Sequence, residues 1–440
     1  MNSILLVNLP TAAVASTPNF VMPLGVLALV AYLRHYNKDV DFVDLNVHKD
    51  IRPYLQKKPR MVGLSVMVAG QFNEAYEICK LVKQMYPKTR TVVGGAHVSQ
   101  FAEDICNNCP EIDEVVVGEG EEKLFYLDTI RRPLDDIPFI KDINKLPWPA
   151  YDLLNFEDYR RDYSTWNNPY NADLGIRVPI VTSRGCPNHC NFCSVYNHMG
   201  SKYRAMDSSN VVDMIEWLCS YGAHYFAFYD ANFTYSPKRV IDISNEIVRR
   251  NLKIYLDLPT GLPINKHAPE MVDALAEAGL IRTTLSIESG DETIRNKVMH
   301  KKSGQADIAT TVEAIRKHPQ IYLLTDFIFG IPEDTIESVS STYRLIETLD
   351  TDDITVSIAT PYPGTALYEQ CVRDGLFASD IDLKELYKAE WYCHANLNRF
   401  SIKPYNMSIE DLCHFRDKIL SLKPKKLAVY KKRMERFSNG

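Results

Sequence analysis

Runs of aliphatic and β-branched residues alternate with amphipathic helical segments along most of this 440-residue chain. Such alternation predicts parallel strands joined by helices, because a parallel strand must be reached through a crossover segment. The first series extends from residue 3 to about residue 126 and contains the runs SILLVNLP, VDFVDLN, MVGLSVMV, TRTVVGG and EVVVGEG. It predicts a doubly wound domain, which is a parallel sheet with helices on both faces.

A second alternating series begins at RVPIVTSRG and ends near TPYPGT. It holds six strand–helix units, too few for a closed eight-stranded barrel, so we expect an α/β fold with a partial (β/α)6 barrel. The chemistry of such a barrel belongs at the carboxyl ends of its strands. In this chain those ends carry Cys186, Asp230, Glu288, Gly330 with Glu333, and Thr360.

Both series together predict four parts. Residues 1–130 form the doubly wound domain, 131–172 a linker, 173–375 the partial barrel, and 376–440 a C-terminal helical cover. The linker prediction rests on the loss of alternation in RRPLDDIP and STWNNPYN. The basic tail KPKKLAVYKKRMERF carries an apolar stripe at helical spacing, and we expect it to pack on its own protein rather than on a membrane or RNA.

The net charge of −6 gives the chain no general attraction to nucleic acid. The longest apolar stretch, residues 20–33, is shorter than the roughly 20 residues of a membrane span, and the apolar start lacks a basic leader. We therefore expect no membrane span and a cytoplasmic protein. Thiols are kept reduced there, so a tight cysteine cluster indicates metal binding or chemistry rather than disulfides.

Such a cluster occurs in RGCPNHCNFCS, where Cys186, Cys190 and Cys193 follow the pattern C-x3-C-x2-C. Zinc would need a fourth ligand, which His189 or His198 would supply in a closed structural site. A four-iron cluster normally takes four cysteines, so three leave one iron open to bind another molecule. Structural zinc cysteines usually come as two pairs, and the triplet instead follows the first barrel strand, where active sites lie.

With Phe192 before the last cysteine, this loop resembles the signature of the radical S-adenosylmethionine (SAM) superfamily. The resemblance implies a [4Fe-4S] cluster on Cys186, Cys190 and Cys193. In that family the open iron chelates SAM, and one electron from the cluster splits SAM into a 5'-deoxyadenosyl radical that abstracts a hydrogen atom from substrate. It also implies an external electron donor such as flavodoxin or ferredoxin.

Further positions fit the secondary motifs of that superfamily. The resemblance places Asp230, in FYDANF, near the methionine amino group, and Ser286 with Glu288, in LSIESG, near the ribose and the methionine carboxylate. The segment FGIPE resembles the region that packs on adenine through the backbone near Ile331. Phe192 and these four residues are the expected SAM contacts.

The first domain adds a cofactor to these expectations. Its strand ends at Asn8, Ser65, Gly94 and Gly118 mark where a doubly wound domain binds ligands, although glycines there can be ordinary turn residues. Joined through LPWPAYDLL to the cluster domain, it resembles the cobalamin-binding radical SAM enzymes. The resemblance implies cobalamin, with contacts at Asn8, Ser65, Met67, Gly94, Gly95, Gly118 and Glu119. The motif D-x-H-x-x-G is absent, and members of this family commonly lack it.

The resemblance predicts a methyltransferase that moves a methyl group from methylcobalamin to an unactivated carbon, or to phosphorus, of a small biosynthetic intermediate. The alternative is a radical cyclase, dehydratase or rearrangement enzyme whose first domain is a scaffold or uses cobalamin without methyl transfer. Methylthiolation of RNA or protein and a zinc module without catalysis are weaker hypotheses. Core or interface packing is the simpler interpretation of the aromatic residues Tyr362, Trp391 and Tyr392, and substrate contact is the other.

Overall fold

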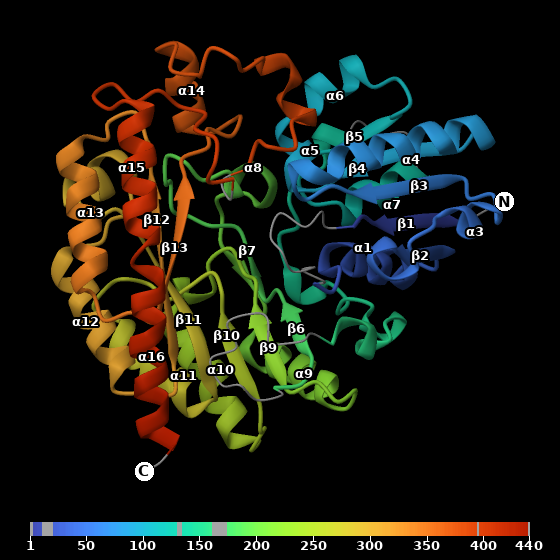
Figure 1. Ribbon diagram of the computed structural model, residues 1–440. Helices are drawn as coiled ribbons and strands as arrows, with labels where there is room; N and C mark the ends of the chain where they lie inside the picture. The colour runs from blue at the N-terminus through green and yellow to red at the C-terminus, as the bar shows by residue number, and fades with distance from the viewer. Residues whose placement is uncertain (1–2, 11–20, 130–133, 161–173, 394–395, 439–440) are drawn as a thin grey trace. The chain divides into compact units, whose positions relative to one another are not determined.

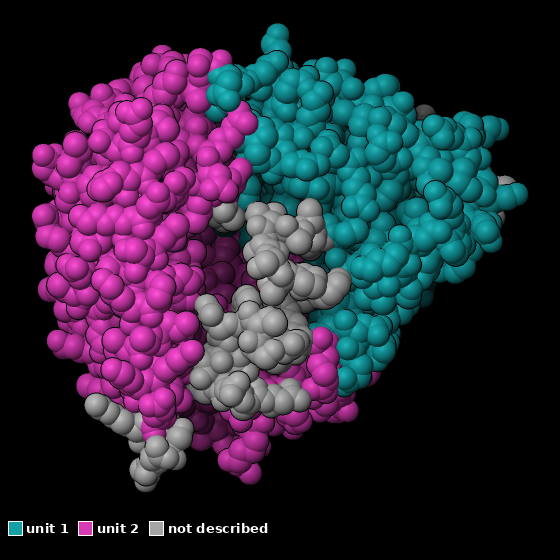
Figure 2. Space-filling model, viewed as in Figure 1, with its two compact units in different colours: residues 1–159, 194–204, 380–393 teal, residues 160–193, 205–379, 394–440 magenta. Residues whose placement is uncertain are grey.

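The computed structural model describes residues 3–10, 21–129, 134–160, 174–393 and 396–438. The remaining residues, including 161–172 of the expected linker, lie outside this description. The chain divides into two compact units, shown in different colours in Figure 2. Unit 1 comprises Met1–Tyr159, Ser194–Arg204 and Asp380–Cys393, and unit 2 comprises Arg160–Cys193, Ala205–Ser379 and His394–Gly440.

Unit 1 contains a five-stranded parallel sheet in the order β2-β1-β3-β4-β5. Its strands are β1 (Ile4–Asn8), β2 (Val40–Asp44), β3 (Met61–Ser65), β4 (Arg90–Gly94) and β5 (Glu114–Val116). This is a doubly wound order, in which the direction of winding reverses between β1 and β3. Ligands of such sheets bind at that reversal, beyond the carboxyl ends of the strands.

Most helices of unit 1 bury apolar side chains, whereas α8 (Val195–Met199) has no buried residue. The helices are α1 (Leu24–His35), α2 (Leu45–His48), α3 (Arg52–Leu55), α4 (Phe72–Met85), α5 (Ala96–Gln100), α6 (Ala102–Asn108), α7 (Glu121–Thr129) and α8. Helices α1 and α7 share a buried core with Ile4, Leu6 and Val92 of the strands, and α4 lies on the other face (Figure 1). The predicted doubly wound domain is confirmed.

Helix α4 shows how the local sequence sets an element. Ala75, Ile78, Cys79 and Val82 repeat at helical spacing and are all buried, so one stripe of the helix faces the sheet. The helix ends at Met85 because Pro87 disfavours the helical conformation of the residue before it.

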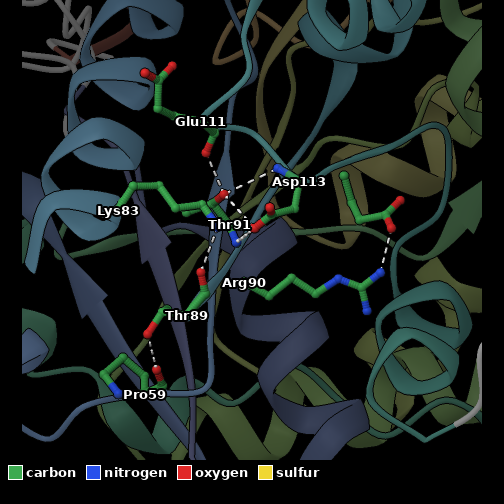
Figure 3. Close-up of polar contacts among 8 residues, drawn as sticks. Pro59, Lys83, Thr89, Arg90, Thr91, Glu111 and Asp113 are labelled. Carbon is green, nitrogen blue, oxygen red and sulfur yellow. Dashed lines mark hydrogen bonds and ion pairs between the residues drawn. The ribbon is translucent and has the colours of Figure 1, made fainter. Parts of the chain in front are cut away.

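At the amino-terminal ends of these strands, polar side chains on β4 and on the turn before β5 form hydrogen bonds and ion pairs (Figure 3). Asp113 accepts hydrogen bonds from the backbone and hydroxyl of Thr91 and pairs with Lys83 at 2.6 Å. Arg90 pairs with Glu114, which begins β5. These contacts hold β4, β5 and α4 together at the amino-terminal ends of the strands. The expected ligand site lies at the opposite, carboxyl-terminal ends.

Unit 2 is built on six parallel strands in the order β13-β12-β11-β10-β9-β6. They are β6 (Arg177–Ile180), β9 (Tyr225–Phe228), β10 (Tyr255–Leu258), β11 (Leu280–Glu288), β12 (Tyr322–Phe329) and β13 (Asp353–Ile358), with a separate pair β7 (Ser183–Arg184) and β8 (Arg204–Ala205). Among the described residues β6 and β13 do not pair, so the sheet is open at both edges, as expected of the partial barrel.

Helices alternate with the barrel strands (Figure 1). They are α9 (Ser208–Cys219), α10 (Pro237–Arg249), α11 (Ala268–Glu277), α12 (Gln305–Arg316), α13 (Ile336–Thr348) and α14 (Ala366–Arg373), and α15 (Ile409–Leu420) and α16 (Lys423–Ser438) follow after the last strand. The Ser236 hydroxyl caps α10 by accepting a hydrogen bond from Arg239, and Pro237 occupies the first turn.

A buried ion network lies toward the amino ends of the barrel strands. Arg177 on β6 donates two hydrogen bonds to Asp257 on β10, at 2.9 and 2.6 Å, and Arg282 on β11 approaches the same oxygen at 3.2 Å. Burial alone would raise the pKa of Asp257, but the two guanidinium groups outweigh it and lower the pKa. We call these three residues the floor triad.

The C-terminal helix α16 packs on unit 2 as its apolar stripe predicts. Tyr430 is buried edge-on against Tyr322 of β12, and Arg433 pairs with Asp352 at 2.6 Å. Lys423 donates to the Ile354 carbonyl of the edge strand β13, which removes one free acceptor from that edge. Among the described helices, none combines the length and apolarity that a membrane crossing requires.

Candidate active site

The three cysteines lie in the loop after β7, and none of them is in a disulfide. The loop opens at Gly185, whose φ of 78° favours glycine, and Cys193 donates its N–H to the Cys190 carbonyl. Asn191 anchors the loop twice, because its N–H donates to Met299 and its carbonyl accepts from Leu367. The loop is therefore held by two distant segments of unit 2.

The thiols fit a cluster better than a single ion. All three are partly exposed, and the Asn232 amide donates to the Cys186 sulfur at 3.5 Å. No group of three or more His, Cys, Asp or Glu among the described residues is placed to hold one metal ion. Three cysteines that each bond a different iron of a cluster need not converge on one point.

Asp230 lies at the end of β9 and is fully buried. Its carboxylate accepts hydrogen bonds from Thr182 N–H and hydroxyl and from the Ser183 hydroxyl at 2.5 Å. Burial raises the pKa of Asp230, against the opposing effects of Arg239 and these donors. These bonds hold the turn that leads into the cysteine loop, and direct contact of Asp230 with SAM stays a prediction.

Glu288 ends β11 in an unusual backbone conformation. The register shifts between Ser286 and Glu288, and Glu288 has a φ of 69°. Its carboxylate pairs with Lys301 at 3.0 Å. Burial would lower the pKa of Lys301, but Glu288, Cys190 and Cys193 raise it, so Lys301 stays charged. A cation thus lies close enough to affect two of the cysteines expected to hold the cluster and the residue expected near the SAM carboxylate.

A polar row crosses the sheet beside Glu288. Ser286, Asp326 and Thr355 are register partners on β11, β12 and β13, and each is at least partly exposed while Phe327 is buried. The Ser286 hydroxyl donates to Asp326 at 3.3 Å. Burial, with the nearby charge of Glu288, raises the pKa of Asp326 to about 7. This face of the barrel sheet therefore carries an acid that titrates near neutral pH.

The segment FGIPE forms a tight turn after β12. Gly330, with a φ of 85°, and Ile331 both donate their N–H groups to the Asp334 carboxylate. Burial raises the pKa of Asp334 to about 6. Ile331 is buried in an apolar cluster against which Phe192 of the cysteine loop packs. The two expected apolar SAM contacts thus share one core.

In unit 1, the expected cobalamin residues line up at one edge. Asn8 lies opposite Ser65, and Ser65 lies opposite Gly94, at the carboxyl ends of β1, β3 and β4. Met67, just beyond β3, is 49% exposed, although a methionine side chain is normally buried. Gly95 has a φ of 113°, and an added Cβ would lie 2.5 Å from the Val66 carbonyl oxygen. Small residues beside an exposed apolar one fit a large flat ligand.

Side chains at the carboxyl ends of these strands also hold the loops that follow them. The Asn8 amide donates to Asp44, and Asn46 and Gln71 both donate to the Leu9 carbonyl. Gly118, with a φ of 78°, donates its N–H to the Ser99 hydroxyl. The turn that follows β1 is therefore fixed from β2 and from the start of α4.

Glu119 was expected to contact cobalamin, but its carboxylate already has partners within unit 1. Its carboxylate pairs with Arg204 at 2.8 Å and accepts the Ile140 N–H at 2.8 Å. The two charged side chains are only 8% and 5% exposed. Contact between Glu119 and cobalamin therefore stays a prediction for its backbone, because the carboxylate is engaged inside unit 1.

The expected substrate residues lie in two places. Tyr362 is partly exposed in the turn before α14, where its carbonyl accepts from Thr365. Tyr392 is 1% exposed and packs edge-on against Phe101 in unit 1, next to partly exposed Trp391. Burial of Tyr392 agrees with the packing interpretation.

His97 belongs to the same packed region of unit 1. Its ring Nε2 lies 2.7 Å from the Tyr387 carbonyl oxygen, and burial lowers its pKa. This contact holds the segment Asp380–Cys393 on unit 1.

Comparison with known proteins identifies the family. Residues 10–125 match the family model of the B12 binding domain, and residues 180–346 match that of the radical SAM superfamily. The uncharacterized methyltransferase PH0819 of Pyrococcus horikoshii is 30% identical over 380 residues, which cover 80% of this chain and 79% of that protein. The chain belongs to the B12-binding radical SAM enzymes.

Two further similarities extend this result. The radical S-adenosylmethionine methyltransferase TsrM of Kitasatospora setae has the same fold, with a TM-score of 0.74 at 19% identity over 96% of this chain and 89% of that one. An anaerobic magnesium-protoporphyrin IX monomethyl ester cyclase of Cereibacter sphaeroides is 27% identical over 80% of this chain, which spans 59% of the cyclase.

Membership in the B12-binding radical SAM enzymes decides between the metals left open by the sequence. The family's cofactors are a [4Fe-4S] cluster, SAM and cobalamin, so the metal group is an iron–sulfur cluster rather than zinc. That Cys186, Cys190 and Cys193 hold this cluster stays a prediction. The non-catalytic zinc module is thereby wrong. The match of the first domain to a B12-binding model also disfavours methylthiolation, which would need a second cluster there.

Sequence reasoning missed four residues of this radical SAM enzyme: Lys301, Asp326, Asp334 and Arg204. Asp334 had a local signal, because an aspartate three residues after the turn glycine-isoleucine pair is placed to accept their N–H groups. Lys301 and Arg204 had none, because their partners Glu288 and Glu119 lie far away in sequence.

Proposed function

We propose that this enzyme transfers a methyl group from methylcobalamin to an unactivated carbon, or to phosphorus, of a small biosynthetic intermediate. The proposal rests chiefly on one observation, that a B12-binding domain and a radical SAM domain match successive parts of this chain. Names of similar proteins, including a methyltransferase of which this chain covers 79%, support it. When bound, the cluster supplies the electron that splits SAM, and cobalamin supplies the methyl group.

The residues of unit 2 have defined roles in this proposal. Cys186, Cys190 and Cys193 hold three irons of the cluster and leave the fourth for SAM. Ser286 and Glu288 contact the ribose and methionine carboxylate, with Phe192 and Ile331 on the adenine side. Lys301 pairs with the Glu288 carboxylate and orients it beside the cysteine loop. Asp230 holds the turn before that loop.

The residues of unit 1 would hold cobalamin by shape rather than through a lower histidine ligand. Asn8, Ser65 and Gly94 form the floor of the site at aligned strand ends. Gly95 and Gly118 let the backbone approach the ligand, and exposed Met67 offers an apolar contact. Tyr362 and Trp391 are the proposed substrate contacts. An external donor such as flavodoxin or ferredoxin reduces the cluster, and the enzyme acts in the cytoplasm.

Analysis of the products of SAM tests this function without knowledge of the substrate. Anaerobically reconstituted protein should carry about four irons per chain and release 5'-deoxyadenosine under dithionite. With cobalamin bound it should also form S-adenosylhomocysteine, because the methyl group must first leave SAM. Changing the three cysteines to alanine should abolish 5'-deoxyadenosine, and continued formation would show that the assigned cluster is wrong.

The cyclase similarity keeps ring closure without methyl transfer as the alternative. An enzyme of that kind would form 5'-deoxyadenosine but no S-adenosylhomocysteine, with or without cobalamin. Formation of S-adenosylhomocysteine only by the cobalt-loaded protein would exclude it.

A further inference from the structure

The segment that leaves the third cluster cysteine belongs to unit 1. Cys193 is the last residue of its stretch of unit 2, and Ser194–Arg204 is part of unit 1. Helix α8 of this segment packs beside α5, and Gln100 donates to the Ser194 hydroxyl at 3.4 Å. Helix α5 itself begins at Ala96, directly after Gly95 at the carboxyl end of β4. The segment is thus attached to the edge where cobalamin is proposed to bind.

Arg204 is the last residue of this segment, and its buried guanidinium bonds several acceptors of unit 1. One of its terminal nitrogens lies 2.8 and 2.9 Å from the two Glu119 oxygens and 2.6 Å from the Ile140 carbonyl. The other terminal nitrogen donates to the Met199 carbonyl at 2.6 Å. Only a planar, five-donor guanidinium can satisfy these acceptors together, so the geometry of the ion pair is tightly defined.

Phe139 fills the space beside this ion pair. Its ring lies 5.4 Å from the Arg204 guanidinium, and added Cβ atoms on Gly118 and Gly200 would come within 3.2 and 3.1 Å of the same ring. Both glycines have positive φ values. The loop after β5 and the segment after Cys193 therefore both pack against the same aromatic side chain, which is 37% exposed.

We propose that Glu119 and Arg204 form a positioning lock that joins the cobalamin edge of unit 1 to the segment leaving Cys193, so that cobalamin bound at this edge stabilises the cysteine loop. The inference rests on the proposed function, because it takes cobalamin as the ligand. Coupling between two sites is reciprocal, so an ordered cysteine loop also favours cobalamin binding.

Hydrogen exchange of the full-length protein tests the lock with hydroxocobalamin as the probe. In the wild type, hydroxocobalamin should slow exchange in peptides covering residues 186–204 by roughly 5-fold or more, as expected for a coupled site. The variant Glu119→Gln should lose this effect. The matched control is Glu114→Gln, which removes the same charge at the opposite end of β5, where Glu114 pairs with Arg90. It should keep the effect.

Arg204→Lys separates the geometry from the charge, because lysine keeps the positive charge but cannot bond all the acceptors. It should lose the protection of residues 186–204 while it still binds hydroxocobalamin. Retention of iron against a chelator provides a second measurement, and both lock variants should release iron faster than Glu114→Gln.

Two outcomes would overturn the inference. If wild type retains cobalt but residues 186–204 exchange equally with and without it, or if the lock variants behave as Glu114→Gln does, no lock couples the two regions. If wild type retains no cobalt, the cobalamin part of the proposed function fails and the inference fails with it. Cobalt content of the wild type distinguishes these cases.

Discussion

Single side chains in unusual positions mark the candidate site of unit 2. Glu288 adopts a left-handed conformation that is rare outside glycine, and the register shift before it turns its carboxylate to Lys301. Strained residues of this kind persist only where surrounding contacts hold them, and they concentrate at functional sites. Asp326 lies nearby and has a raised pKa, because burial and the negative charge of Glu288 both oppose its ionisation.

We expect Asp326→Asn to change how stability depends on pH. The pKa of Asp326 is about 7 in the folded protein and about 3.9 when unfolded. Between these values only the folded state holds the proton, so wild-type stability falls as pH rises, by up to about 1.4 kcal/mol per pH unit. The Asn variant lacks this loss. Urea unfolding from pH 5 to 8 should show its relative stability increasing with pH, and parallel curves would contradict the raised pKa.

Gly95→Ala should disrupt the cobalamin edge. A Cβ there would lie 2.5 Å from the Val66 carbonyl oxygen, and the φ of 113° is unfavourable for alanine. We expect a loss of about 1–3 kcal/mol of unfolding free energy and a weaker affinity for hydroxocobalamin, measured by spectroscopic titration. Gly25→Ala is the matched control, because Gly25 lies in α1 with open space around it and alanine favours the helix. Its affinity for hydroxocobalamin should be unchanged.

The sequence singles out candidate site residues most readily where they lie within one short segment. Cys186, Cys190 and Cys193 are such candidates because a single loop carries all three, and their role as cluster ligands stays a prediction. Lys301 and Arg204 are not, because each pairs with its carboxylate only once the chain has folded, Lys301 with Glu288 at the end of β11 and Arg204 with Glu119 in the loop after β5. Glu119 is a mixed case. Its position between two glycines was visible in the sequence, but the pairing of its carboxylate with Arg204 was not.

At the scale of elements, alternating strands and helices were predicted well because hydrophobic periodicity is a local property. Every strand expected in the two series is present, and Ser236 and Pro237 begin α10 as expected. The floor triad was not predicted, because Arg177, Asp257 and Arg282 come from three strands whose pairing the periodicity does not specify. The only sign of the triad in the sequence is that charged residues occur inside otherwise apolar strands.

Asp257→Asn should destabilise unit 2 strongly. The carboxylate is fully buried, and its loss leaves two buried guanidinium groups without their anion. Breaking a buried ion pair in this way costs about 3–5 kcal/mol, whereas an exposed pair contributes about 0–1 kcal/mol. Asp242→Asn, which removes the exposed partner of Lys238 on α10, is therefore the control. Urea unfolding of both variants measures the difference, and equal midpoints would contradict the role of the triad.

At the scale of the whole molecule, the two units are not continuous in sequence. Unit 1 recruits Ser194–Arg204 and Asp380–Cys393 from parts of the chain expected in the barrel and the C-terminal cover. The second of these segments is held by Tyr387, which packs edge-on against Phe72 and whose carbonyl lies 2.7 Å from His97. Periodicity did not indicate this assignment, because it describes which face of an element is buried and not against which partner.

His97 should make unit 1 sensitive to acid. Burial lowers the pKa of His97 in the folded protein, so below about pH 6.5 the unfolded state takes up a proton that the folded state does not. Stability is therefore lost as pH falls, by up to about 1.4 kcal/mol per pH unit. Protection of residues 380–393 from proteolysis should decline between pH 7.5 and 5.5, and less so in His97→Gln. An equal decline in both would contradict this origin.

The interleaved arrangement of unit 1 bears on how such enzymes diverge and are engineered. A fragment ending near residue 160 would lack Arg204 and Tyr387, and would expose Glu119 without its counterion together with the aromatic surface of Phe72. Exchange of the first domain between relatives as a cassette would therefore produce insoluble hybrids unless both recruited segments moved with it. Recombination sites for functional chimaeras therefore have to leave Ser194–Arg204 and Asp380–Cys393 with the first domain.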